Sequence, residues 1–373
     1  MPTTASSAAR TPSAQSRPFG RESTTRSARA RPRNPAVCET AATTHAGRRL
    51  DANPPRKSEQ PQPTEERNAR TFGTRRPYRL RSARSRPLGC ASMGGADYVV
   101  ATDVAQAVAL KAAGSRVLAG GTDHYPVLVG RPPAGPVVDI TRIASLRGIA
   151  REGDRFRFGA LTTWADVARA DLPRGFDALR AAAREVGAVQ VQNAGTIAGN
   201  LVTASPAGDG VPSFLALDAT VEVTGPKGAR ELPLSSFITG YRATALAPDE
   251  IVTAVCVPAS VADAGSSFQK LGLRRYLVIS IVMVAAQIES AGGKVTAARV
   301  AVGSCSPVAQ RLPALEADLV GRGVGDDLAA LVEERHLAPL SPIDDVRATA
   351  AYRMRAARTL VGRALREAAE RSR

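Results

Sequence analysis

The chain has 373 residues, 44% of them hydrophobic, which is enough for two or three packed subdomains. Its formal net charge of +16 would suggest a nucleic-acid partner, but residues 1–92 hold 19 Lys and Arg against 6 Asp and Glu, whereas the remainder holds 31 against 28. The basic character belongs to a tail on a nearly neutral remainder, which argues against a nucleic-acid-binding protein.

Residues 1–92 are rich in Ser, Thr, Pro and Arg and show no apolar periodicity. Such a segment cannot bury enough apolar area to offset the entropy of ordering, so we expect a disordered basic tail. Three explanations are open: an over-extended start with translation beginning at Met93, a transit-like presequence, or a functional basic arm. We favour the first.

The sequence predicts no secretory signal, membrane span or metal site. The beginning of the chain lacks an apolar core segment, and the longest apolar run, Leu277 to Ala286, is far shorter than the roughly 20 residues that cross a bilayer. That run is typical of a buried strand. No two of the four cysteines form a close pair, so we expect neither zinc nor an iron–sulfur cluster, in a soluble cytoplasmic protein.

From residue 96 onward the apolar pattern becomes regular. Thr102 is expected to cap a helix over residues 103–113 that ends at Gly114. Short apolar runs at 116–119 and 137–140 are typical of parallel strands. This part therefore resembles a small βαβ unit.

The next elements alternate between strands and helices. The pattern predicts a strand at 155–159, helices at 163–170 and 175–186, a β-hairpin at 219–224 and 229–234, and further strands at 267–270, 278–288 and 295–302. A last helix carries an apolar stripe, which indicates core packing or a partner-binding face: Ala351, Met354, Ala357, Val361, Leu365 and Ala368.

Two glycine-rich segments, 117–123 and 193–200, are the most informative motifs. Glycines let successive backbone N–H groups converge on an anion, and a nearby Thr hydroxyl adds a donor. Two such segments could hold a diphosphate from both sides, which favours a dinucleotide cofactor. The alternative is that both are merely tight turns.

Five segments occur in a recognisable order: Ala119-Gly-Gly-Thr-Asp123; Gln192-Asn-Ala-Gly-Thr-Ile-Ala-Gly-Asn200; Ser205-Pro-Ala-Gly-Asp-Gly-Val-Pro212 followed by Leu215-Ala-Leu-Asp-Ala219; Lys270-Leu-Gly-Leu-Arg-Arg275; and Ser341-Pro-Ile-Asp-Asp-Val-Arg347 with Tyr352-Arg353. With these segments, residues 96–370 resemble the FAD-binding middle subunit of the molybdenum hydroxylases, the xanthine dehydrogenase and carbon monoxide dehydrogenase family.

The resemblance implies an α+β fold: a two-subdomain FAD-binding fold of the vanillyl-alcohol oxidase and p-cresol methylhydroxylase (PCMH) type, followed by a C-terminal antiparallel sheet with a helical bundle. The implied subdomains are 93–150 (α/β), 151–262 (α+β) and 263–373. FAD would lie between the first two, with its ring facing the third.

The resemblance also implies partners. A [2Fe-2S] small subunit and a molybdopterin large subunit would complete the complex, as a dimer of heterotrimers, and FAD would pass electrons to NAD⁺ or another acceptor. The alternative is a free-standing FAD oxidoreductase of related fold, which would need a substrate base beside the flavin. No Ser/His/Asp or Cys/His catalytic set appears, and none is needed because flavin carries the chemistry.

The expected cofactor-binding residues are Leu118, Ala119, Gly120, Gly121, Thr122, Asp123, Asn193, Gly195, Thr196, Ile197, Gly199, Asn200, Asp209 and Lys270. Asp209 would accept a ribityl or ribose hydroxyl, with turn capping as the alternative. Asn193 and Asn200 would either bond the cofactor or orient the loop. We expect Asp123 to bond backbone amides, and His124 either to contact the cofactor or to pack. Ala198 stands where the family usually has a second glycine.

Lys270, Arg275 and Tyr276 are the candidates for tuning the ring. A cation near the N1–C2 carbonyl edge of a flavin raises its reduction potential, and Tyr276 could stack on the ring. The alternatives are solvated strand charges for Lys270 and Arg275, and a core position for Tyr276.

Overall fold

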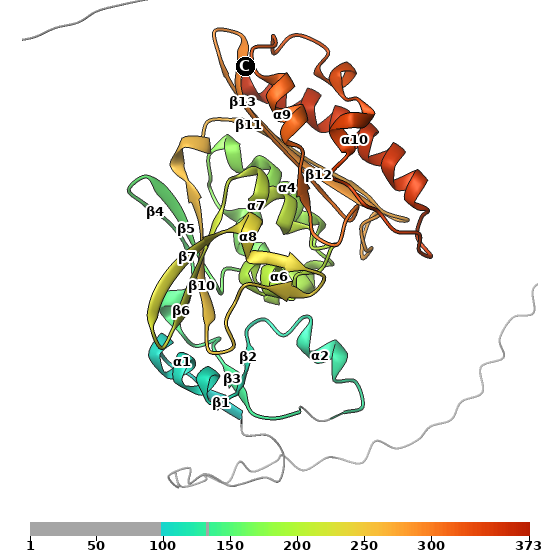
Figure 1. Cartoon of the computed structure of the whole chain (residues 1–373). Helices are drawn as coiled ribbons and strands as arrows, with labels where there is room; N and C mark the ends of the chain where they lie inside the picture. The colour runs from blue at the N-terminus through green and yellow to red at the C-terminus, as the bar shows by residue number, and fades with distance from the viewer. Residues whose placement is uncertain (1–97, 132–133) are drawn as a thin grey trace, which may run out of the picture. The chain divides into compact units, whose positions relative to one another are not determined.

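The computed structural model describes residues 98–131 and 134–373. The predicted basic tail, residues 1–92, lies outside the described residues. The described part contains three larger sheets in chain order, with a two-stranded ribbon before the third (Figure 1). No helix within these ranges combines the length and apolar character that crossing a membrane requires.

The first sheet is parallel and has the strand order β1-β3-β2. Its elements are β1 (Tyr98–Val100), α1 (Val104–Ala112), β2 (Arg116–Leu118), α2 (His124–Val127) and β3 (Val137–Asp139). The expected parallel unit is confirmed, but its predicted cap is wrong by one residue. The carboxylate of Asp103 accepts the Gln106 amide at 2.8 Å, so Asp103 rather than Thr102 caps α1.

The second sheet is antiparallel, with the order β4-β5-β10-β6-β7. The predicted hairpin is confirmed: β6 and β7 pair with Gly225 opposite Gly228, which leaves a two-residue turn. The strands of the second sheet are β4 (Ile149–Glu152), β5 (Arg155–Gly159), β6 (Thr220–Gly225), β7 (Gly228–Pro233) and β10 (Ile251–Pro258).

Helices cover one side of this sheet and enclose its core. Thr163 caps α3 through a reciprocal pair of hydrogen bonds with Asp166. Phe158 of β5, Trp164 and Phe214 are fully buried in this core. The intervening elements are α3 (Trp164–Arg169), α4 (Asp177–Glu185), α5 (Val189–Ala194), α6 (Ile197–Thr203), α7 (Gly210–Ala216), α8 (Leu234–Phe237), β8 (Ile238–Gly240) and β9 (Ala243–Thr244).

The third sheet, β11-β12-β13-β14, is antiparallel and buried on both faces. Alternate β12 residues such as Val284 pack in one cluster with Leu365 of α10, whereas Met283 packs with residues of α4 and α7. Figure 1 shows α10 lying along the sheet. The elements are β11 (Gly265–Leu271), β12 (Val282–Ala291), β13 (Lys294–Gly303), β14 (Gln310–Arg311), α9 (Pro313–Leu319) and α10 (Ala350–Ser372).

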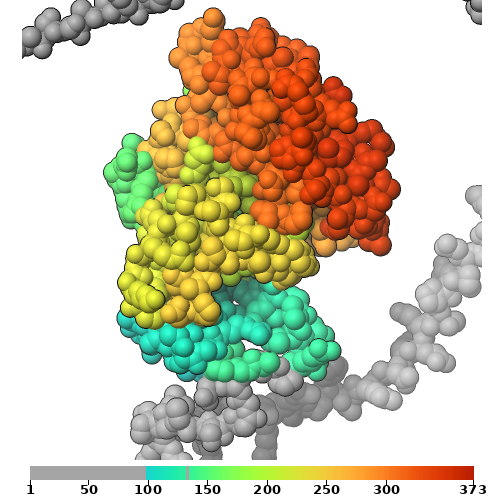
Figure 2. All heavy atoms as spheres, viewed as in Figure 1, coloured from blue at the N-terminus to red at the C-terminus, as the bar shows by residue number. Residues whose placement is uncertain are grey.

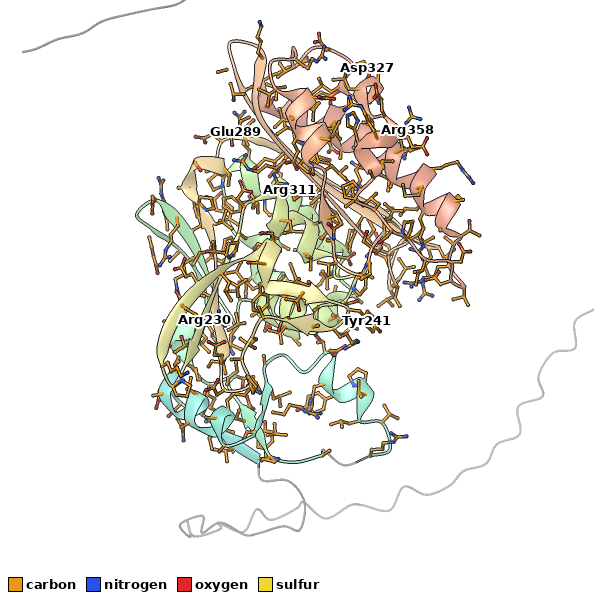
Figure 3. The ribbon with its side chains drawn as sticks, in the orientation of Figure 1. Arg230, Tyr241, Glu289, Arg311, Asp327 and Arg358 are labelled. Atoms are coloured by element: carbon orange, nitrogen blue, oxygen red, sulfur yellow. The ribbon has the colours of Figure 1, made fainter. Side chains whose placement is uncertain are left out.

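Arginines join the third sheet to the second region. Arg311, labelled in Figure 3, donates to the Leu215 carbonyl at 3.0 Å and to Asp218 at 2.8 Å. Arg299 binds the same carboxylate. The stripe predicted on the last helix is confirmed as core at Ala357, Val361, Leu365 and Ala368, and Met354 packs partly buried against it. The prediction is wrong for Ala351, which is exposed. The subdomain boundaries stay predictions.

The apolar run Leu277 to Ala286 does not form one buried strand. β12 begins only at Val282, while Leu277 and Ile279 are exposed and belong to the connection from β11. Leu277 has a φ of 50°, which a strand cannot accommodate. The first part of the run forms the connection between the antiparallel strands β11 and β12.

Candidate functional site

A cavity of about 930 Å³ lies against the first sheet, α6 and β10, near the upper end of the ~300–1,000 Å³ range typical of ligand pockets. Figure 2 shows the hollow between the blue-green N-terminal region and the yellow segment above it. Both glycine-rich segments line it, together with residues from 205–209 and 277–279. Segments far apart in sequence therefore meet in one space.

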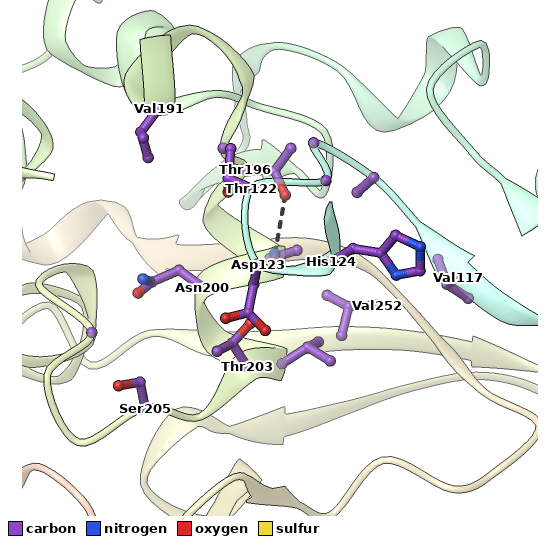
Figure 4. Close-up of a pocket in the computed structure, with 18 of the residues that line it drawn as sticks. Val117, Thr122, Asp123, His124, Val191, Thr196, Asn200, Thr203, Ser205 and Val252 are labelled. Carbon is purple, nitrogen blue, oxygen red and sulfur yellow. Dashed lines mark hydrogen bonds between the residues drawn. The ribbon is translucent and has the colours of Figure 1, made fainter. Parts of the chain in front are cut away.

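The first glycine-rich segment connects β2 to α2 (Figure 4). The amides of Gly120, Gly121 and Thr122 donate to no residue that the structure describes, although all three residues line the cavity. Gly121 has a φ of 71°, which favours glycine. Three consecutive amides are thus available as donors.

The second segment is partly helical, which corrects the predicted loop. α5 ends at Ala194, Gly195 turns the chain, and Thr196 caps α6 by accepting the Gly199 amide at 3.0 Å. Gly199 therefore lies on a helix. The predicted sequence of elements lacked α5.

The two segments touch each other. A Cβ on Gly120 would lie 1.8 Å from the Ala194 oxygen, and one on Gly195 would lie 3.2 Å from Thr122 Oγ1. The absence of side chains at Gly120 and Gly195 therefore lets the segments pack closely, a reason the sequence could not reveal. Their contact forms one continuous wall.

Asn200 carries a buried oxygen without a partner. Its Oδ1 makes no hydrogen bond to any described residue, and Asn200 lines the cavity (Figure 4). An unsatisfied buried amide costs free energy unless a ligand or water supplies a donor. By contrast, Asn193 is exposed and Ile197 packs in the core, and neither lines the cavity.

Asp209 forms a buried polar cluster at the cavity wall. Its carboxylate accepts from Lys270 Nζ at 2.7 Å and from Ser280 Oγ at 2.7 Å, while Lys270 also donates to the Glu185 carbonyl. The side chains of Lys270 and Asp209 are only 6% and 9% exposed. Burial raises the pKa of Asp209, against the opposing effect of Lys270 and Ser280. Asp209 makes no capping hydrogen bond, so the turn-capping alternative is wrong.

The three candidates for tuning the ring have different surroundings. Lys270 and Arg275 line a second cavity of about 550 Å³, which shares Val278 with the first. Tyr276 is 60% exposed, so the core alternative is wrong for it. The Arg275 guanidinium lies 5.3 Å from the Tyr276 ring centroid, within cation–π range.

Asp123 does not bond backbone amides as predicted. It pairs with Arg242, with Nη1 to Oδ2 at 3.2 Å, and both residues line the cavity. His124 also lines the cavity, with its ring edge-on to Tyr125. Arg242 was missed because no local motif links it to a partner 119 positions away.

Further cavity residues were also missed, including the cations Lys111 and Arg116. They precede the first glycine-rich segment and carry no motif of their own. Trp164 lines the cavity too, and a Cβ on Gly210 would lie 2.1 Å from its ring. With the free amides, these residues favour an elongated ligand that combines anionic groups with hydroxyl donors.

One cluster of possible metal ligands exists among the described residues: Glu222, Glu231 and Cys256. Arg157 binds Glu222 at 2.9 Å, and Arg155 binds Glu231 at 2.5 Å. Burial raises the pKa of Cys256 to about 11, so its thiol stays protonated near neutral pH. The cluster is explained by ion pairing.

Two family models match consecutive parts of the chain: the FAD binding domain in molybdopterin dehydrogenase over residues 92–260, and the CO dehydrogenase flavoprotein C-terminal domain over 267–368. The nicotinate dehydrogenase FAD-subunit of Eubacterium barkeri is 37% identical over 47% of this chain, and the alignment spans only 62% of that subunit. Caffeine dehydrogenase subunit beta of Pseudomonas sp. (strain CBB1) is 30% identical, over 74% of this chain and 95% of that subunit.

A solved structure is similar throughout the matched region. Carbon monoxide dehydrogenase from Hydrogenophaga pseudoflava, in a form that lacks the Mo-pyranopterin moiety, contains a chain that is 30% identical with a TM-score of 0.67. The similarity covers 74% of this chain and 98% of that one.

The chain therefore belongs to the family of FAD-binding medium subunits of the molybdenum hydroxylases. The resemblance, the α+β FAD-binding fold with its C-terminal domain, and FAD as cofactor are confirmed, and the protein is a subunit of an oxidoreductase. The cavity fits such a group, because it offers free amides and the unpartnered Asn200 oxygen.

Proposed function

We propose that this chain is the FAD-carrying electron-transfer subunit of a molybdopterin-dependent hydroxylase. Its electrons would come from [2Fe-2S] clusters on a small subunit, which a molybdopterin large subunit reduces. The acceptor would be NAD⁺ or another oxidant. When bound, FAD supplies a carrier that takes up electrons and hands them on.

The observation that carries the proposal is the meeting of the two glycine-rich segments in one cavity. The free amides of Gly120, Gly121 and Thr122 would hold the diphosphate, with Thr196 on the opposite segment. Lys111 and Arg116 contribute positive charge to the same wall. The Asn200 oxygen would accept a hydroxyl of the cofactor.

Asp209 lines the first cavity and its partner Lys270 lines the second, and both would contact or adjoin the ring, although their side chains are already paired. Lys270 has a third N–H beyond its bonds to Asp209 and Glu185. Arg275 would add positive charge nearby, and the exposed Tyr276 is free to stack. The positive charges of Lys270 and Arg275 would raise the reduction potential.

The family supports two partner subunits, and we propose a dimer of heterotrimers in a cytoplasmic compartment. The alternative, a free-standing FAD oxidoreductase, differs in its subunit composition. Purification from the native host separates the two: the proposal predicts a flavin- and iron–sulfur-containing complex with two further polypeptides. A single active flavoprotein chain would support the alternative.

FAD binding by the chain itself is tested by equilibrium dialysis of the purified full chain. The proposal predicts one FAD per chain, with the flavin absorbance retained. A folded chain that holds no more FAD than the protein-free side of the dialysis cell would contradict the proposal. Addition of NAD⁺ to the reduced complex then tests the acceptor through formation of NADH.

A further inference from the structure

Arg353, in the first turns of α10, is the one arginine only 2% exposed among the described residues. Its guanidinium donates to the Ile281 carbonyl at 2.6 Å, the Ser304 carbonyl at 3.1 Å and Asp345 Oδ1 at 2.7 Å. Its Nε has no partner in the described part of the chain. Burying a guanidinium charge is costly. We therefore expect the three groups that Arg353 binds to have a structural role.

The Ile281 carbonyl connects Arg353 to the cavity wall. Ile281 follows Ser280, whose hydroxyl is buried and donates to Asp209 Oδ1 at 2.7 Å. The Ile281 amide is fixed as well, by the Leu271 carbonyl at 2.8 Å. Arg353 therefore anchors the end of the segment that presents Ser280 to the cavity wall.

The Ser304 carbonyl connects Arg353 to another part of the same wall. Ser304 has a φ of 63°, and its amide donates to the Pro206 carbonyl at 3.0 Å. The 205–208 turn lines the cavity through Ser205, Ala207 and Gly208. A non-glycine residue in the left-handed region is strained, so the bond from Arg353 to its carbonyl helps to keep Ser304 in place.

The third partner fixes Arg353 itself. Asp345 also accepts the amides of Arg347 and Ala348 and the Arg347 side chain. Burial alone would raise the pKa of Asp345, but these hydrogen bonds lower it well below its usual range, so the carboxylate stays charged. The guanidinium is thus held in one orientation by a carboxylate that is charged near neutral pH.

We propose that Arg353 is a positioning residue for the FAD site: by binding the Ile281 and Ser304 carbonyls it fixes Ser280 and the 205–208 turn, and so sets the position of Asp209. This inference rests on the proposed function of the cavity. It also implies that the C-terminal helix contributes to cofactor binding without lining the cavity.

The test compares full-chain Arg353→Lys with the wild type and with Arg363→Lys, a control on an exposed position of the same helix. Lysine keeps the charge but cannot reach three acceptors in a planar fork. We expect FAD binding by Arg353→Lys to weaken by about tenfold, equivalent to ~1.4 kcal/mol. In the FAD-free protein, amide hydrogen exchange should accelerate at Ser304 and Ile281 more than in β13.

Ser280→Ala and the double variant Arg353→Lys/Ser280→Ala separate positioning from general destabilisation. If Arg353 acts through Ser280, the double variant loses less FAD affinity than the product of the two single losses. Multiplicative losses together with uniformly faster exchange across the C-terminal sheet would overturn the inference. A wild type that binds no FAD would defeat the proposed function instead, while the exchange comparison would still report on the anchoring.

Discussion

Replacing Gly120 by alanine should force apart the two segments that meet in the cavity. The added Cβ would lie 1.8 Å from the Ala194 oxygen and 2.6 Å from its carbonyl carbon. Real Cβ atoms essentially never approach another heavy atom within 3.0 Å, so the wall must open by at least the difference of 1.2 Å. Both obstructing atoms belong to the backbone, so no side chain can rotate away.

The cost follows from this displacement. Over-packing of a close contact typically destabilises a protein by about 1–3 kcal/mol. Binding sites tolerate displacements of only about 0.5 Å, so we expect FAD affinity to fall on the order of 10- to 100-fold. A 10- to 100-fold loss of affinity corresponds to about 1.4–2.7 kcal/mol, so the effects on FAD binding and on folding should be of similar size.

The assay is a fluorescence titration of FAD with the full chain, together with urea unfolding of the FAD-free protein. Gly325→Ala is the matched control, since its Cβ would meet only Arg373 Nη2 at 3.8 Å and its φ is not positive. We expect the control to behave as the wild type. Gly120→Ala with wild-type FAD affinity and unchanged unfolding would refute the reasoning.

Three further substitutions give distinct outcomes. Asn200→Leu removes an unpartnered buried oxygen, so the FAD-free protein should unfold no more easily, while FAD should bind about tenfold more weakly in the same titration. The control Asn193→Leu changes an exposed residue and should alter neither quantity. Lys270→Met leaves the Asp209 carboxylate buried without its cation, so the free energy of unfolding at pH 7 should fall by about 3–5 kcal/mol. Urea unfolding should show that this loss shrinks as pH falls, because protonated Asp209 tolerates burial. Asp345 has a lowered pKa, so its stabilising contribution is fully present above pH ~4 and is lost as pH falls from there through that lowered pKa. The difference in urea unfolding between wild type and Asp345→Asn should therefore shrink progressively below pH ~4, and a constant difference would count against the assignment.

Local patterns predicted much of the fold. The short runs at 116–119 and 137–140 became paired parallel strands, and the hairpin around Gly225 and Gly228 formed as expected. These elements depend on interactions within a few residues, or on apolar runs that pack in only one way. Periodicity carries that information.

The errors lie where tertiary context decides. Leu277 and Ile279 are as apolar as Val284, yet they are exposed in a connection while Val284 is buried in β12. Hydrophobicity alone cannot show where an antiparallel strand begins. The polar pattern 189–194 likewise gave no apolar stripe by which α5 could be predicted.

At the site, motifs identified residues but not their contacts. The sequence pointed to Asp209 and Lys270 separately, and only the fold shows that they form a buried pair across 61 positions. Arg242 and Arg353 were not predicted as site residues, because the partners that link them to the cavity, Asp123 and Ile281, are 119 and 72 positions away. Such pairings arise from topology, which no local spacing encodes.

The central claim is that the amides of the first glycine-rich segment bind the diphosphate of FAD. A crystal structure of the full chain grown with FAD measures this directly. The account predicts diphosphate oxygens within hydrogen-bonding distance of the amides of Gly120, Gly121 and Thr122, with a cofactor hydroxyl on Asn200 Oδ1. Bound FAD whose diphosphate lies away from these amides would contradict it.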